Sequence, residues 1–179
     1  MSTELYSTNI TGVNILKSKK FSDKRGFFLN NFRIQDDAFK SSWGERKVSQ
    51  INLSITKKVG SIRGLHFQEK PYVDAKLVRC LKGKIFDVVV DLRKDSETFL
   101  KFYSIELSDQ DNNSILIPEG CAHGFQVLEP QSELLYIHSG EWIPESENGI
   151  RWNDPKLSIP WPLEPEDISE RDKSLPLIS

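Results

Sequence analysis

Apolar and polar residues alternate with a period of two through most of the middle of the chain. In the clearest run every second residue is apolar: Phe86, Val88, Val90 and Leu92. Such alternation predicts a β-strand with one fully apolar face. Further strands are expected at Val48–Ile55, Ser61–Phe67, Lys76–Leu81, Phe102–Leu107, Ser114–Ile117, Cys121–Leu128 and Glu133–His138.

The segments between these runs are short and rich in turn residues, as at Lys82–Gly83 and in the polar stretch 108–113. This spacing predicts an all-β fold, an antiparallel jelly roll of the cupin-like sandwich type. Helical signal is limited to Ile34–Ser42, which Gly44 ends, and to a short turn near Ser169. After about Pro144 the chain is rich in Pro, Glu, Trp and Asp, which predicts an extended, ordered tail wrapped on the barrel.

Length and charge narrow the classes of partner. A chain of 179 residues predicts one domain over residues 1–179. Lys and Arg total 24 against 26 Asp and Glu, so no general field attracts nucleic acid or an anionic membrane, and neither is expected as a partner. Cys80 and Cys121 lie in apolar runs and are interpreted as reduced core residues. The N-terminus lacks the basic and apolar regions of a signal peptide, and no run approaches the ~18 apolar residues of a membrane helix, so a cytoplasmic protein is expected.

The motifs that would indicate a metal or a nucleotide cofactor are missing. His66, His123 and His138 stand far apart, and none forms the His-x-His pair of a metal-binding cupin. The chain also contains neither G-x-G-x-x-G nor G-x-x-x-x-G-K-[ST], and it lacks a serine nucleophile elbow. The sequence therefore predicts a site with no metal and no cofactor.

Six short motifs occur in an order and spacing that resemble one family, the dTDP-4-dehydrorhamnose 3,5-epimerases. They are Asp-Lys-Arg-Gly-Phe-Phe at 23–28, Arg-Gly-Leu-His-Phe-Gln at 63–68, Lys-Leu-Val-Arg at 76–79, Phe-Asp-Val-Val-Val-Asp-Leu-Arg at 86–93, Pro-Glu-Gly-Cys-Ala-His-Gly-Phe at 118–125 and Trp-Asn-Asp-Pro at 152–155. The likeness runs from about Arg25 to Asp172. It implies a metal-free jelly roll, a homodimer, that epimerises a nucleotide-linked 4-keto-6-deoxy sugar.

The resemblance assigns the catalytic roles. Removing a hydrogen beside a ketone needs a base, a cation for the resulting enolate oxygen, and an acid on the opposite face. By resemblance His66 is the base, Asp172 the carboxylate that orients it, Lys76 the cation and Tyr136 the acid. Imidazole, with an unperturbed pKa of ~6.5, and phenol, with a pKa of ~10, suit these two proton transfers.

Other positions are assigned to ligand binding by the same resemblance. They match residues that hold the sugar, the diphosphate or the base: Arg25, Gln50, Asn52, Arg63, His123 and Glu147. The chain departs from the family at two more of the residues expected to bind substrate, Asn30 in place of a frequent Glu and Arg171 in place of a Lys.

A third departure puts Glu141–Trp142 where the family commonly has Tyr-Tyr. Trp142 is therefore expected near the site, where its bulk favours inversion of one carbon or a different sugar. The alternative is that Trp142 stacks on the base or packs against the tail.

Each catalytic assignment has a structural alternative. Tyr136 alternates with Leu134 and so fits a core position. Ser169 and Asp172 fit a helix capping box, and Lys76 fits an exposed strand charge. His138 has no family counterpart and is interpreted as structural.

Two further alternatives stay open at this level. Strict alternation puts Arg63 and His66 on opposite faces, so either Gly64 marks a bulge or the arginine serves a site shared across a dimer. A jelly roll that binds sugar nucleotides without catalysis is the rival function. The presence of His66, Lys76, Tyr136 and Asp172 together argues against that rival.

Overall fold

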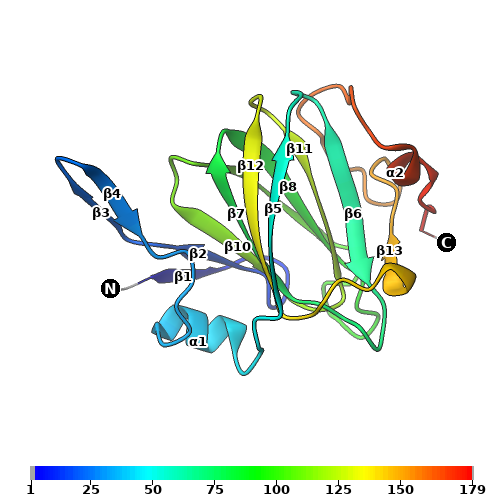
Figure 1. Ribbon diagram of the computed structural model, residues 1–179. Coiled ribbons are helices and arrows are strands. Elements are labelled where there is room, and N and C mark those ends of the chain that lie inside the picture. The colour runs from blue at the N-terminus through cyan, green and yellow to red at the C-terminus, as the bar shows by residue number, and fades with distance from the viewer. Residues whose placement is uncertain (1–2, 179) are drawn as a thin grey trace.

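Two antiparallel sheets packed face to face form the body of the protein, as the computed structural model shows for residues 3–178 (Figure 1). The first sheet has the strand order β1-β2-β10-β7-β12-β5: Glu4–Ser7, Asn14–Lys17, Asn113–Ile117, Lys76–Lys82, Ser132–His138 and Gln50–Thr56. The second has the order β13-β6-β11-β8-β9: Glu147–Gly149, Ile62–Gln68, Cys121–Val127, Lys84–Asp91 and Phe102–Ser108. The predicted all-β sandwich is confirmed, although β5 begins at Gln50 rather than Val48.

The main core lies between the two sheets because their inward residues are apolar. Val78 and Leu134 come from one sheet, Val89 and Phe125 from the other, and all four are buried. Burial of a side chain of this size contributes roughly 1.5–3 kcal/mol. Cys80 and Cys121 are buried, unpaired cysteines of the same core, as predicted.

A helix covers the outer face of the first sheet. Helix α1 spans Asp37–Trp43, and its buried Phe39 and Trp43 pack on that face. The helix starts later than the predicted Ile34, because the Asp36 carboxylate accepts from the N–H of Ala38 at 3.2 Å and caps the first turn. Gly44 ends it as predicted, with φ of 66°.

The tail covers the outer face of the second sheet and is ordered as predicted. Ile150 and Leu157 pack on that face, and the buried Gln126 side chain bonds to both the N–H and the carbonyl of Leu163. The tail then forms a parallel bridge to Ile62 and enters helix α2, Glu170–Ser174. This path brings α2 beside β6 (Figure 1).

The short elements were not predicted: β1, β2, β13, the single 3-10 turn η1 at Pro144–Ser146, and the pair β3 (Lys20–Asp23) and β4 (Gly26–Leu29). The β3–β4 hairpin pairs only with itself and projects from the two sheets (Figure 1). Most of its residues are exposed, so neither strand has the buried face that produces alternation. None of the described helices is long and apolar enough to span a membrane.

Candidate active site

A pocket of about 1000 Å³ lies between the two sheets. Strands β5, β7 and β12 form one wall, β6 and β11 form the other, and the start of α2 closes one side. The polar side chains on these walls include all three histidines of the chain, His66, His123 and His138. Each of the three has a ring nitrogen 2.7 Å from an aspartate oxygen.

His66 and Asp172 form the first of these pairs. His66 Nε2 lies 2.7 Å from Asp172 Oδ1, and Asp172 Oδ2 accepts from the N–H of Gly64 at 3.1 Å. Because an ionised carboxylate only accepts, Nε2 is assigned the proton and Nδ1 keeps its lone pair. Burial acts to raise the pKa of Asp172, but the hydrogen bonds from His66 and from the Gly64 N–H help to outweigh it, and the pKa lies below its usual value.

The start of α2 fixes that carboxylate. Ser169 Oγ accepts from the Asp172 N–H at 3.0 Å and caps the helix. The capping interpretation is therefore right for Ser169. The Asp172 side chain instead turns toward His66 and Gly64.

A bulge in β6 puts Arg63 and His66 on the same pocket. His123 pairs with His66 and Phe125 with Arg63, so two steps along β11 match three along β6. Gly64 has φ of 122°, and a Cβ there would lie 2.6 Å from Gly124 Cα. The structure thus contains the bulge at Gly64 that strict strand alternation requires if Arg63 and His66 are to share one pocket.

Tyr136 faces the pocket from β12, beside the second pair. Its ring centroid lies 6.0 Å from that of His123, whose Nε2 is 2.7 Å from Asp87 Oδ2 in the buried interior. Burial, followed by the charge of Asp87, raises the pKa of Tyr136. The hydroxyl is therefore protonated at neutral pH.

Lys76, at the start of β7, is a buried cation. Its side chain is only 12% exposed, so the alternative of an exposed strand charge is wrong. Burial lowers the pKa of the ammonium, and the charges of Asp74, Glu147 and Asp87 oppose that shift. Lys76 Nζ lies 3.9 Å from Asp74 Oδ2.

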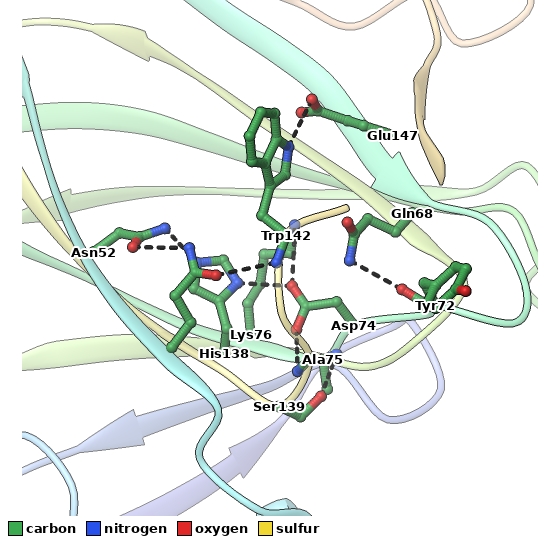
Figure 2. A network of polar contacts seen from close by, with 12 residues as sticks. Asn52, Gln68, Tyr72, Asp74, Ala75, Lys76, His138, Ser139, Trp142 and Glu147 are labelled. Carbon is green, nitrogen blue, oxygen red and sulfur yellow. Dashed lines mark hydrogen bonds and ion pairs between the residues drawn. The ribbon is translucent and has the colours of Figure 1, made fainter. Parts of the chain in front are cut away.

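Trp142 lies at the pocket and links its two sides (Figure 2). Its Nε1–H donates to Glu147 Oε2 at 2.9 Å, and Arg171 Nη2 lies 2.7 Å from the same oxygen. Its backbone N–H donates to Gln50 Oε1 at 3.0 Å. The indole therefore borders the site, as expected, through a bond to Glu147.

Comparisons with known proteins identify the family of the chain. The model of the dTDP-4-dehydrorhamnose 3,5-epimerase family matches residues 7–179. The chain is 42% identical over 174 residues to the enzyme of that name from Salmonella typhimurium, covering 96% of this chain and 93% of the relative. The chain belongs to the dTDP-4-dehydrorhamnose 3,5-epimerase family. Membership in this family classes the protein as an isomerase.

Solved structures support the family at the level of the fold. The epimerase from Bacillus anthracis, crystallised with TDP and PPi bound, superimposes with a TM-score of 0.94 at 36% identity, covering 99% of this chain and 100% of that one. ChmJ, a 3′-monoepimerase from Streptomyces bikiniensis in complex with dTDP-quinovose, superimposes with a TM-score of 0.86 at 30% identity, covering 95% and 85%. The chain is thus similar in structure both to a 3,5-epimerase and to a protein described as a 3′-monoepimerase.

The structure brings most of the predicted site residues to one pocket. Its lining includes His66, Lys76, Tyr136, Asp172, Asn52, Arg63, His123, Glu147, Arg171 and Trp142. Gln50 is not part of this lining, but its Nε2 donates at 3.0 Å to Oδ1 of Asn52, which is part of it. Among the described residues, no group of three or more His, Cys, Asp or Glu side chains is arranged to hold a metal ion.

Arg25 and Asn30 do not reach the pocket of their own chain. Arg25 sits in the turn of the β3–β4 hairpin with its side chain 90% exposed and paired to Asp23, and Asn30 follows β4. The physical reason is that this hairpin is attached to neither main sheet. A binding role for either residue in its own chain's pocket therefore does not fit this geometry.

Asp74, Asp167 and Asp87 were not predicted as site residues, and His138 was interpreted as structural. Asp74, Asp167 and His138 line the pocket, and Asp87 is bonded to His123. Asp87 carried a usable signal, because an aspartate inside a strand with apolar neighbours needs a buried partner. His138 and Asp74 lie 64 residues apart and carried no joint signal.

Proposed function

We propose that the protein epimerises dTDP-4-dehydro-6-deoxyglucose at carbons 3 and 5 to give dTDP-4-dehydro-L-rhamnose. One observation carries the proposal: His66, held by a buried carboxylate, shares a pocket with Lys76 and Tyr136. A base, a cation and an acid around one cavity are the groups that proton transfer beside a ketone requires. The names of the relatives support the choice of substrate.

In the first step His66 removes the proton. The lone pair on Nδ1 takes the hydrogen from the carbon beside the ketone, the C–H electron pair forms a C=C bond, and the carbonyl π pair moves to the oxygen. Asp172 stabilises the imidazolium that results through the bond at Nε2. Each pKa unit between a carbon acid and imidazolium costs ~1.4 kcal/mol, so the enolate needs a fixed charge, which Lys76 supplies.

In the second step Tyr136 returns a proton to the opposite face. The enolate electrons re-form the C=O bond while the carbon takes the phenolic proton, and solvent then restores the proton of Tyr136 and receives that of His66. Because β12 and β6 belong to opposite sheets, the acid and the base approach the ring from different walls of the pocket. Inversion follows from that separation.

Basic and polar groups of the same pocket bind the nucleotide diphosphate. Arg63 and Arg171 offer guanidinium groups suited to phosphate oxygens. His123, Asn52 and Glu147 complete the polar lining, and Gln50 supports Asn52 through a hydrogen bond. The relatives crystallised with TDP or with a dTDP-sugar support thymidine as the nucleoside.

The active form in this proposal is a homodimer. The edge strand β5 exposes three aliphatic side chains, Ile51, Leu53 and Ile55, and the β3–β4 hairpin exposes Phe27 and Phe28. A second copy that covers these residues would accept the hairpin and receive Arg25 at its pocket. Mixing Arg25→Ala with His66→Ala chains tests this directly, because only Arg25 acting in the partner's site rebuilds one complete site.

A mono-epimerase is the second candidate, and Trp142 favours it. The indole is bonded to Glu147 at the pocket, and its bulk limits the rotation of the ring that a second deprotonation requires. The similarity to ChmJ adds support. A binding protein without catalysis is the remaining alternative.

One incubation separates these candidates. The protein is mixed with dTDP-4-keto-6-deoxyglucose in deuterated water and followed by proton NMR. Deuterium entering carbons 3 and 5 supports the double epimerase, deuterium at one carbon supports the mono-epimerase, and none at either contradicts both.

A further inference from the structure

The proposed chemistry leaves one buried pair in the pocket without a role, Asp74 and His138. Asp74 precedes β7, and its side chain is 5% exposed. Asp74 Oδ2 lies 2.7 Å from His138 Nδ1, and Asp74 Oδ1 accepts from the N–H of Gly140 at 3.0 Å (Figure 2). His138 therefore carries its proton on Nδ1 and presents Nε2 as an acceptor.

A chain of hydrogen bonds leads to this pair. The Trp142 N–H donates to Gln50, the Gln50 amide donates to Asn52, and Asn52 Nδ2 lies 3.4 Å from His138 Nε2. With the tautomer above, every donor in the chain points toward Asp74. The ring of His138 also stacks on Tyr136, with centroids 5.8 Å apart and 12° between the planes. The carboxylate of Asp74 is thus held from several sides.

The distance from Asp74 to Lys76 is the informative one. At 3.9 Å, Asp74 Oδ2 is too far from Lys76 Nζ for a hydrogen bond but near enough for strong attraction between the charges. Within residues 3–178 no carboxylate other than that of Asp74 forms an ion pair within 4 Å of Lys76 Nζ. Asp74 therefore supports the charge of the ammonium without engaging its N–H groups.

We propose that Asp74 and His138 are positioning residues for Lys76. Asp74 keeps the buried ammonium charged, and His138, with the Gly140 N–H, holds the carboxylate away from it. The N–H groups of Lys76 then stay available for the oxygen that becomes negative on the substrate. This inference rests on the proposed function, which gives Lys76 that oxygen, and it assigns a role to His138.

The other charged and titratable groups around Lys76 have different partners. Glu147 is bonded to Trp142 and Arg171, and Asp87 is bonded to His123. Cys121 is buried on β11, and burial raises its pKa to about 12, so the thiol is neutral. Tyr136 is likewise protonated. Burial lowers the pKa of Lys76, and among the charges that raise it again Asp74 has the largest effect. Removal of Asp74 should therefore lower the pKa of Lys76 more than removal of any other of these charges.

The test reads the titration of Lys76 itself. The full chain is labelled with lysine carrying ¹³C at the ε carbon, and the Lys76 signal is assigned by its loss in Lys76→Arg. Asp74→Asn should move the titration midpoint of Lys76 to lower pH, while His138→Phe, which keeps the ring but not the donor, should leave the midpoint unchanged or raise it. Both variants should slow deuterium exchange into substrate roughly tenfold to a hundredfold with little change in KM.

Two controls make the result specific. Glu133→Gln removes the carboxylate near Lys82 and should leave the Lys76 midpoint where it is. His138→Asn, whose side-chain amide can donate to Asp74, should recover part of the rate lost in His138→Phe. Thermal unfolding by circular dichroism verifies that each variant is folded, and if Asp74→Asn is not, the two His138 variants decide alone.

The outcomes are distinct. An unmoved Lys76 midpoint in Asp74→Asn, a lowered midpoint in His138→Phe, or unchanged exchange in His138→Phe overturns the inference. The titration needs no turnover, so wild-type protein that exchanges no deuterium contradicts the proposed function and not the electrostatic role of Asp74.

Discussion

His66 Nε2 and Asp172 Oδ1 are 2.7 Å apart, although 106 residues of chain separate them. The β6 bulge, the bridge from Ile62 to Ile168 and the cap at Ser169 bring the two together. The contact joins strand β6 to helix α2 near the end of the chain. The fold of the tail therefore bears directly on the chemistry of the pocket.

Replacing Asp172 by Asn should lower kcat by two orders of magnitude or more, about 10²–10⁴-fold, with little change in KM. The amide keeps the shape of the carboxylate, but it removes the charge that stabilises the imidazolium and fixes the tautomer. Steady-state kinetics measures the split between kcat and KM. Glu170→Gln, an exposed change on the same helix, is the matched control and should leave kcat unchanged. Equal losses in both variants would argue against the role of Asp172.

Asp172 should also make the stability of the fold depend on pH in the acid range. Its pKa in the folded protein lies below the usual value, so its contribution is complete above the unfolded value and is lost as pH falls through the folded one. At pH 7 Asp172→Asn should reduce the free energy of unfolding by about 1–3 kcal/mol. Urea unfolding at a series of pH values should show the difference from wild type shrinking below the unfolded pKa. A constant difference at every pH would contradict the pKa shift.

Gly64→Ala should destabilise the protein by roughly 2–4 kcal/mol. The new Cβ would lie 2.6 Å from Gly124 Cα and 2.7 Å from the His123 carbonyl, in a backbone with φ of 122°. Gly26→Ala is the matched control, because Gly26 has φ of 136° but no atom within 4 Å of its Cβ position. Denaturant unfolding should give the smaller loss for Gly26→Ala, and equal losses would mean that the clash with β11 is absent.

The two sheets were predictable because their strands have an apolar face that packs in the core. Val88 and Val90 pack under the tail, while Val89 packs between the sheets. Alternate residues of this strand therefore face opposite sides of the sheet, which is why a period of two appears in the sequence. The β3–β4 hairpin has no such face, so nothing in its pattern marks it as strand. Single hydrogen bonds, such as the one from Ala38 to Asp36, decide where helices begin, and periodicity does not resolve them.

The site was predictable as far as local motifs reach. His66 and Lys76 lie in motifs that resemble one family, Tyr136 was assigned by the same resemblance, and the pocket contains all three. The Asp74–His138 pair depends on the register between β7 and β12, which places His138 opposite Lys76, two residues after Asp74, and no single motif encodes that register. Arg25 was assigned by motif alone, and its place on a projecting hairpin depends on the tertiary fold.

Trp142→Tyr should shift the balance between the two carbons. The mono-epimerase candidate rests on the indole, which donates to Glu147 and fills space at the pocket; under that candidate, wild-type protein should strongly favour exchange at one carbon of dTDP-4-keto-6-deoxyglucose. The smaller phenol should bring the two exchange rates closer together, as measured by proton NMR in deuterated water. Rapid and equal incorporation at carbons 3 and 5 by wild-type protein would contradict a restrictive role of Trp142.

Proton transfer by His66 in a metal-free pocket is tested most directly by deuterium incorporation at carbons 3 and 5 of the sugar. Wild type, His66→Ala and Tyr136→Phe are compared after exhaustive chelation. Wild type should still incorporate deuterium, His66→Ala should incorporate none while binding dTDP, and Tyr136→Phe should retain exchange but lose net inversion, because the base remains and the acid on the opposite face is gone. Near-normal turnover by His66→Ala, or exchange in wild type that returns only when zinc, iron or manganese is added, would contradict proton transfer by His66 in a metal-free pocket.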